Sequence, residues 1–198
     1  MTRLYRLDAP ASAIAAAFGI EAGDDPWTGD YVAPGRPAPV IVGDGRSGSR
    51  RFLRPRLWGV APPPKGVQPV TTVRNLQSPF WIGTLRHAEL RCLVPATAFA
   101  LWSGSAGARR QHWFSLASRP VFAFAAIQRQ IEDWPGFAIL TSEPNRLVAH
   151  YHEGAMPLIL HAEDHDRWLT ADWRDAAALV APYPGQLMRV GDRPPPAL

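Results

Sequence analysis

Arg91-Cys92-Leu93-Val94-Pro95-Ala96 is the stretch that decides the fold, because a short apolar run of this kind is typical of a buried strand. Comparable runs follow it, rich in β-branched or aromatic residues and separated by turn signals, at Phe99–Trp102, Trp113–Leu116, Val121–Ile127 and Phe137–Leu140. Many short strands at this spacing indicate an antiparallel, barrel-like sheet. The centre of the chain is therefore expected to form a barrel-like β core.

Shorter elements are expected around this core. A helix is predicted over residues 9–18, with Asp8 as N-cap, Pro10 in its first turn and Gly19 as its C-terminal stop. This helix would hold an N-terminal strand, and with it residue 2, in place. Further strands are predicted over 40–42, 52–60 and 158–160, and further helices over 142–151, 162–170 and 176–180. The predicted fold class is α+β, with an antiparallel barrel-like core flanked by short helices.

Length and composition favour one domain. A chain of 198 residues, 46% of them hydrophobic, buries a sizeable core and suits a single domain over residues 1–190. The proline-rich segment 191–198 is expected to be a flexible tail. No apolar run is long enough to span a bilayer, and the start lacks a signal peptide, so a cytoplasmic protein without membrane contact is expected. A monomer is also expected. Cys92 is the single cysteine, which excludes an internal disulfide, and its apolar strand makes it a core residue.

The basic residues are almost all arginines, whose planar guanidinium donates to two phosphate oxygens at once. The net charge is only +4. Five arginines gather just before Trp58, at positions Arg46, Arg50, Arg51, Arg54 and Arg56. They form either a basic wall beside a nucleic-acid groove or a solvated loop and strand face, and the sequence leaves both interpretations open.

Five motifs occur in a fixed order: Leu57-Trp58-Gly59-Val60, Thr71-Thr72-Val73-Arg74-Asn75, Ser78-Pro79-Phe80-Trp81, Arg91 to Ala96, and His152 to Pro157. Together they resemble the SOS-response-associated peptidase (SRAP) family over nearly the whole chain. The resemblance implies recognition of abasic sites in single-stranded DNA. In that family a cysteine at position 2 becomes the N-terminus, condenses through its α-amine with the sugar aldehyde, and closes a stable thiazolidine ring with its thiol. An asparagine, a glutamate and a late histidine complete the family's site.

Three of these family positions differ in this chain. The cysteine is replaced by Thr2, the asparagine by Thr72 and the glutamate by Leu101, whereas the histidine remains as His152. An alkyl hydroxyl needs a neighbouring base before it becomes a nucleophile, and a leucine shuttles no protons. The resemblance therefore implies a DNA-damage-associated protein that has lost stable cross-linking, with Thr2 and His152 as the remaining candidate catalytic residues.

Four residues are candidates for DNA contact. Arg74 matches the family arginine at the DNA backbone, and Asn75 follows it in the same motif. Trp58 either stacks on an exposed base or belongs to the core. Thr141 matches a family threonine near the phosphate, and Asn145 is expected to cap the following helix. His152 itself is either the family's reactive histidine or a satisfied core residue.

Three functions remain open. The first is binding of single-stranded or abasic DNA without a lasting covalent bond. The second is a residual enzyme whose Thr2 α-amine forms a reversible Schiff base, with an N-terminal threonine hydrolase as a remoter variant. The third is a protein-interaction module that kept only the fold. No cofactor is expected, and no metal site either, because His161 and His165 have helical spacing but lack the accompanying glutamate of zinc proteases.

Overall fold

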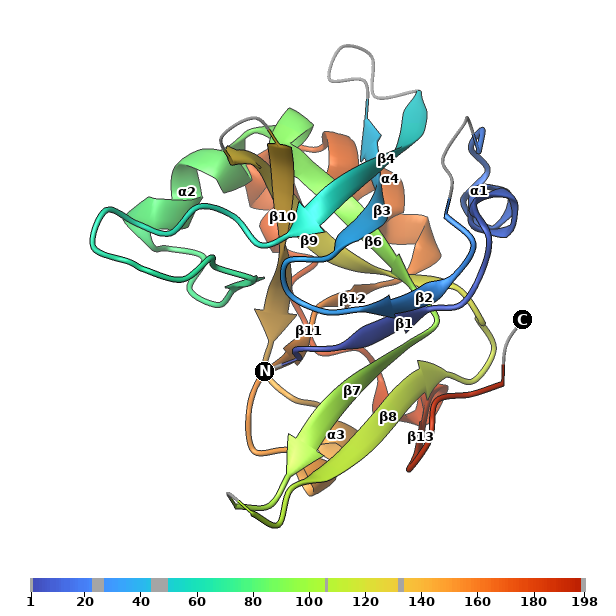
Figure 1. The fold of residues 1–198 in the computed structure, drawn as a ribbon. Coiled ribbons are helices and arrows are strands. Elements are labelled where there is room, and N and C mark those ends of the chain that lie inside the picture. The colour runs from blue at the N-terminus through green and yellow to red at the C-terminus, as the bar shows by residue number, and fades with distance from the viewer. Residues whose placement is uncertain (1, 23–26, 44–49, 106, 132–133, 197–198) are drawn as a thin grey trace.

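The computed structural model describes residues 2–22, 27–43, 50–105, 107–131 and 134–196 (Figure 1). Its centre is a closed barrel of five strands, β3 (Pro37–Gly43), β4 (Arg51–Trp58), β6 (Arg91–Ala96), β9 (Phe122–Ile131) and β10 (Trp134–Ser142). The ring closes because β10 pairs with both β9 and β4. The predicted barrel-like core and α+β class are confirmed.

One barrel contact departs from the predicted antiparallel arrangement. Strands β4 and β10 pair in parallel at Gly136 and Phe137, whereas the other neighbours around the ring are antiparallel. Only a tight hairpin forces an antiparallel pair, and a long stretch of chain separates β4 from β10. Two-residue strands extend the barrel: β5 (Thr72–Val73) and β11 (Met156–Pro157) pair with β10, and β12 (Ile159–Leu160) pairs with β9.

A second sheet lies against the barrel, below it in Figure 1. Its order is β13 (Met188–Gly191), β8 (Arg110–Leu116), β7 (Ala98–Ser103), β1 (Tyr5–Leu7) and β2 (Asp30–Val32). Along β7, Phe99 and Leu101 join the main core, while Ala98 and Ala100 belong to a separate small cluster on the opposite face. This alternation is the two-residue period of a strand, and it gives the sheet an inner and an outer face.

In the part of the chain that the structure describes, five short α-helices cover the sheets: α1 (Ala11–Phe18), α2 (Pro79–Arg86), α3 (Arg146–Tyr151), α4 (His165–Thr170) and α5 (Trp173–Ala177). The predicted N-cap of α1 was wrong, because Pro10 occupies that position while the Asp8 carboxylate pairs with Arg6. Gly19 ends α1 in the left-handed conformation as predicted, with φ of 63°. The helix predicted over 162–170 is divided into a 3₁₀ turn, Ala162–Asp164, followed by α4. The Ser78 hydroxyl caps α2, a helix that the sequence analysis did not predict.

The N-terminal strand is anchored by aromatic packing. The fully buried Tyr5 ring lies 5.2 Å from the Trp58 ring and 5.9 Å from the Phe124 ring, measured between centroids. This packing fixes β1 on the barrel and thereby places residues 2–4 at its end. Cys92 is fully buried, and desolvation raises the pKa of its thiol to about 12, so it stays protonated in the core.

At the other end of the chain, strand β13 reaches Gly191 and the following prolines run back along the second sheet. The Arg6 guanidinium donates a hydrogen bond of 2.6 Å to the Pro195 carbonyl. Of the helices described, none is long and apolar enough to cross a membrane.

Candidate functional site

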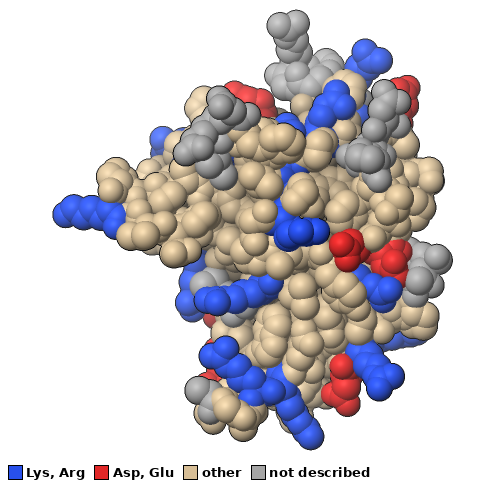
Figure 2. Space-filling model, in the orientation of Figure 1, with Lys and Arg blue, Asp and Glu red and all other residues tan. Residues whose placement is uncertain are grey.

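A cavity of about 700 Å³ opens where the N-terminal segment, the β7–β8 turn and the chain after α3 meet. Its charged and titratable lining residues are Arg3, Arg74, Arg109 and His152, and none of the described lining residues is acidic. Figure 2 shows basic side chains gathered on this face, around the N-terminal end and the β7–β8 turn. Several arginines without an opposing carboxylate create a positive potential suited to a phosphate-bearing ligand.

His152 is oriented by the strand beside it. It follows the last residue of α3, and its Nδ1 lies 2.9 Å from the Trp102 carbonyl oxygen. A carbonyl only accepts, so Nδ1 carries the hydrogen and Nε2 is the basic nitrogen of the neutral ring. Burial lowers the pKa of His152 below its ordinary value, against the opposing effect of the Trp102 hydrogen bond. At neutral pH His152 is therefore a proton acceptor.

Gly154 leaves the space that this imidazole fills. A Cβ at position 154 would lie 2.6 Å from Nε2 of His152, which is closer than real Cβ contacts allow. Both residues line the large cavity. The position of the ring therefore depends on a glycine two residues further along the chain.

Thr2 lies beside the cavity and is almost fully buried, with 3% of its surface exposed. The next two residues, Arg3 and Leu4, form part of the cavity wall. The Thr2 hydroxyl has no hydrogen-bond partner among the residues that the structure describes. A hydroxyl without a base in contact is not activated as a nucleophile.

The two other positions that differ from the family pattern are structural in this fold. Leu101 is fully buried in the core, on the face of β7 that points away from the cavity residue Trp102. Thr72 is half-buried in β5 and pairs with Ile139 of β10. An acidic side chain, Glu143, lines a neighbouring cavity instead.

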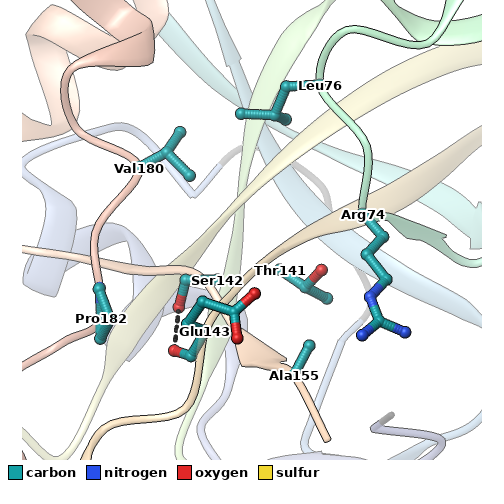
Figure 3. Close-up of a pocket in the computed structure, with 8 residues that line it drawn as sticks. All are labelled: Arg74, Leu76, Thr141, Ser142, Glu143, Ala155, Val180 and Pro182. Carbon is teal, nitrogen blue, oxygen red and sulfur yellow. Dashed lines mark hydrogen bonds between the residues drawn. The ribbon is translucent and has the colours of Figure 1, made fainter.

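That neighbouring cavity has a volume of about 220 Å³ and shares Arg74 and Ala155 with the large one. In Figure 3 the Glu143 carboxylate and the Arg74 guanidinium lie on either side of Ala155. Thr141 also lines this cavity, and its hydroxyl donates to the Val73 carbonyl at 3.2 Å. Arg74 is therefore the charged side chain that both cavities share, while the Thr141 hydroxyl is already bonded to the backbone.

The prediction that Trp58 stacks on a base was wrong. Trp58 is fully buried, its indole N–H donates to the Thr71 carbonyl at 3.0 Å, and its ring stacks on Phe137. Burial of both faces leaves no surface for a nucleotide. Asn75 is exposed next to Arg74, and its side-chain oxygen accepts from the Gln77 N–H, which shapes the turn before α2.

Three of the arginines before Trp58 make contacts on strand β4, away from the large cavity, and Arg50 is exposed just before this strand. Arg51 pairs with Asp166, Arg54 covers the Phe52 ring, and Arg56 donates to the Gln128 side chain at 3.0 Å. These contacts fit the solvated strand face rather than a basic groove wall. Arg46 lies outside the described residues.

Within the described residues, no group of three His, Cys, Asp or Glu side chains is arranged to hold a metal ion. His161 stacks on Tyr183 and His165 stacks on Phe18. The Asn145 side chain accepts from the Val148 N–H at 2.9 Å, so its predicted capping role is confirmed.

Sequence reasoning missed Arg3, Arg109 and Glu143 as residues of the two cavities. Arg3 could have been predicted, because it directly follows Thr2, which the family motif already marked as a site residue. Arg109 comes from a hairpin turn and Glu143 from the end of β10, and only tertiary packing brings these segments toward Arg74.

Solved structures share this fold at low sequence identity. A protein from Bacteroides thetaiotaomicron is 20% identical with a TM-score of 0.76, covering 94% of this chain and 90% of that one. A protein from Bordetella bronchiseptica is 18% identical with a TM-score of 0.78, covering 95% and 97% of the respective chains. A phage-related protein from the same organism is 16% identical with a TM-score of 0.74, covering 96% and 92%. At these identities the likeness concerns the fold alone.

No curated protein matches the chain. A family model does, and its description is "SOS response associated peptidase (SRAP)". The match runs over residues 1–192, which include both sheets, all five helices and the arginine-lined cavity. The chain therefore belongs to the SRAP family.

Proposed function

We propose that this protein binds single-stranded DNA at abasic sites without forming the stable thiazolidine link of its family. The observation that carries the proposal is the large cavity, which combines three arginines with His152 and has the N-terminal segment in its wall. Phosphates on either side of a lesion meet guanidinium groups, and a missing base leaves the sugar accessible to the cavity. Family membership supports DNA as the partner.

Stable cross-linking is not expected from these residues. Thr2 has no thiol, and a hydroxyl closes only an oxazolidine, a ring that reopens readily. Its hydroxyl has no base in contact among the described residues, and Leu101 supplies no proton. A shuttling carboxylate contributes about 100- to 10,000-fold in rate, so the leucine would slow the reaction even beside an intact nucleophile.

A reversible Schiff base is the second candidate function. Removal of Met1 would leave the α-amine on Thr2, next to the cavity wall formed by Arg3 and Leu4. Such an amine has an ordinary pKa of about 7.7 to 8.0, which leaves a neutral fraction at physiological pH. The uncharged His152 accepts protons in the same cavity. Borohydride reduction with abasic single-stranded DNA should then trap an adduct, and a mass spectrum without any adduct would rule this candidate out.

Arg74 provides the test of binding. We expect Arg74→Ala to weaken binding of abasic single-stranded DNA and to lower the salt dependence of log K by about 0.7, the value for one phosphate contact on a single strand. Fluorescence anisotropy at several salt concentrations measures both quantities. Arg167→Ala, which removes an exposed arginine of α4, is the matched control. Equal affinity and equal salt slope for the two variants would contradict the proposal.

A further inference from the structure

The centre of the outer face of the second sheet is apolar, whereas a solvated sheet face is normally polar. Ala98 and Ala100 of β7 lie at its centre, under Trp113 of β8, with Leu4 and Trp102 packed beside them. This cluster is separate from the main core. The small alanines form a low floor, and the larger side chains form walls around it.

Two aromatic rings meet above this floor. Tyr31 is on β2 and Trp113 on β8, three strand spacings apart, which is about 14 Å between backbones. Their ring centroids are nevertheless only 5.6 Å apart, so both side chains lean inward. Trp113 is 5% exposed and Tyr31 is 44% exposed, so Tyr31 presents the accessible ring. The Arg6 guanidinium lies 5.5 Å from the Tyr31 centroid and steadies it.

Each end of this aromatic surface leads to a cationic cavity. At one end Leu4 and Trp102 also line the large cavity with its three arginines. At the other end a cavity of about 350 Å³ is lined by Arg189 and Ser115 on one side and by Pro195 and Pro196 of the C-terminal segment on the other. Arg189 lies opposite Ser115 in the register, and Ser115 lies two residues beyond Trp113, so this end belongs to the same outer face.

We propose that this outer face is the path of the single strand next to the abasic nucleotide, with Tyr31 as the ring on which an intact base stacks. The inference rests on the proposed function, because it assigns the flanking nucleotides of that ligand. Positive charge at both ends and an aromatic ring between them match a chain that alternates phosphates and bases. From Trp102 to Ala98 the strand rises about 13 Å, room for no more than about four stacked bases.

The test compares short and long DNA on three variants. Tyr31→Ala should weaken binding of a twelve-nucleotide abasic strand by at least about fivefold, the lower bound for one base–aromatic stack. It should leave a trinucleotide, which fills only the large cavity, unchanged. Tyr31→Phe keeps the ring and should bind like wild type. Trp134→Ala removes an aromatic side chain that is 47% exposed on β10, away from this face, and should also bind like wild type.

Wild-type protein gives a second readout that needs no variant. A 2-aminopurine placed one to four nucleotides from the abasic site should be quenched on binding, and the same probe placed nine nucleotides away should not. Equal affinity of wild type and Tyr31→Ala for the long strand, or quenching without positional dependence, would overturn the inference and leave the proposed function intact.

An undamaged oligothymidylate separates the two ideas. If wild type binds it as tightly as the abasic strand and Tyr31→Ala weakens both, the lesion preference fails while the stacking surface stands. If neither DNA binds, and a proline-rich peptide binds wild type but not Tyr31→Ala, the surface serves a protein ligand and both proposals fail.

Discussion

The His152 ring is oriented by a hydrogen bond to the Trp102 carbonyl, and it occupies space that is open because residue 154 is a glycine. We expect Gly154→Ala to push the imidazole away from the Trp102 carbonyl, because the new methyl group would lie 2.6 Å from Nε2. Displacement should raise the pKa of His152 toward its ordinary value, because relief of desolvation, the largest effect on this group, outweighs the loss of the Trp102 hydrogen bond. It should also weaken binding of abasic DNA. NMR titration of the imidazole protons measures the pKa.

Gly83→Ala is the control for this substitution. Gly83 lies inside α2, and a Cβ there meets no atom within 4 Å. Alanine at a helix interior should stabilise the protein by about 0.5–1 kcal/mol and leave the His152 titration as it is. An unchanged His152 pKa in Gly154→Ala as well would mean that the ring does not depend on this glycine.

The capping side chains of α2 and α3 differ in the number of hydrogen bonds that they make. Ser78 caps α2 with one hydrogen bond to the Phe80 N–H, whereas Asn145 caps α3 and also donates to the Tyr183 carbonyl at 2.6 Å. Ser78→Ala should therefore cost about 1 kcal/mol, and Asn145→Ala about 2–3 kcal/mol because a second bond is lost. Thermal unfolding measures both, at about 2–4 °C per kcal/mol for a chain of this size. Equal losses would show that the Tyr183 contact contributes nothing.

Elements with a clear local sequence pattern were predictable, and elements without one were not. Strands β6, β9 and β10 contain apolar runs, and their existence follows from this local pattern alone. Helix α2 was missed because Phe80, Trp81 and Gly83 are poor helix formers, so only Ser78 and Pro79 marked it. Strand β2 has three residues after a Gly-rich and Pro-rich stretch, too few to show a period. The division into a barrel and a second sheet depends on long-range pairing, which no local pattern encodes.

For the candidate site, the order of the motifs predicted which residues belong to it, but the sequence did not predict which side chains are buried. Motif order identified Arg74 and His152, and the structure places both in one cavity. Trp58 was misassigned because a buried and an exposed tryptophan look alike in sequence. The aromatic cluster around Tyr31 escaped notice because its rings come from strands that are neighbours only in the folded sheet.

Stability of the whole molecule should depend on pH through His165. This ring is buried against Phe18, and its pKa falls from 6.5 to about 4, first through desolvation and then through the charges of Arg51 and Arg119, with Glu163 opposing. Between about pH 6.5 and pH 4, His165 is therefore protonated in the unfolded chain but largely neutral in the folded chain. The free energy of unfolding should be highest above pH 6.5 and should fall by up to about 3 kcal/mol as pH drops to 4.

Urea denaturation at pH 7, 5.5 and 4 measures this dependence. The matched variant is His165→Gln, which is uncharged throughout this range and should lose less stability on acidification than wild type. Parallel pH profiles for the two proteins would assign the acid sensitivity to other groups. His152, whose pKa is also lowered, contributes equally to both proteins and cancels in the comparison.

The closed barrel also bears on how the protein behaves at high concentration. A sheet that closes on itself has no edge strand, so each of the ring strands β3, β4, β6, β9 and β10 pairs with a neighbour on both sides. The second sheet does have edges, but β2 spans three residues and β13 four, and prolines follow β13 soon afterwards. Prolines lack the N–H that a new strand would need. A chain that is nearly half hydrophobic is thereby protected against edge-to-edge aggregation by its topology.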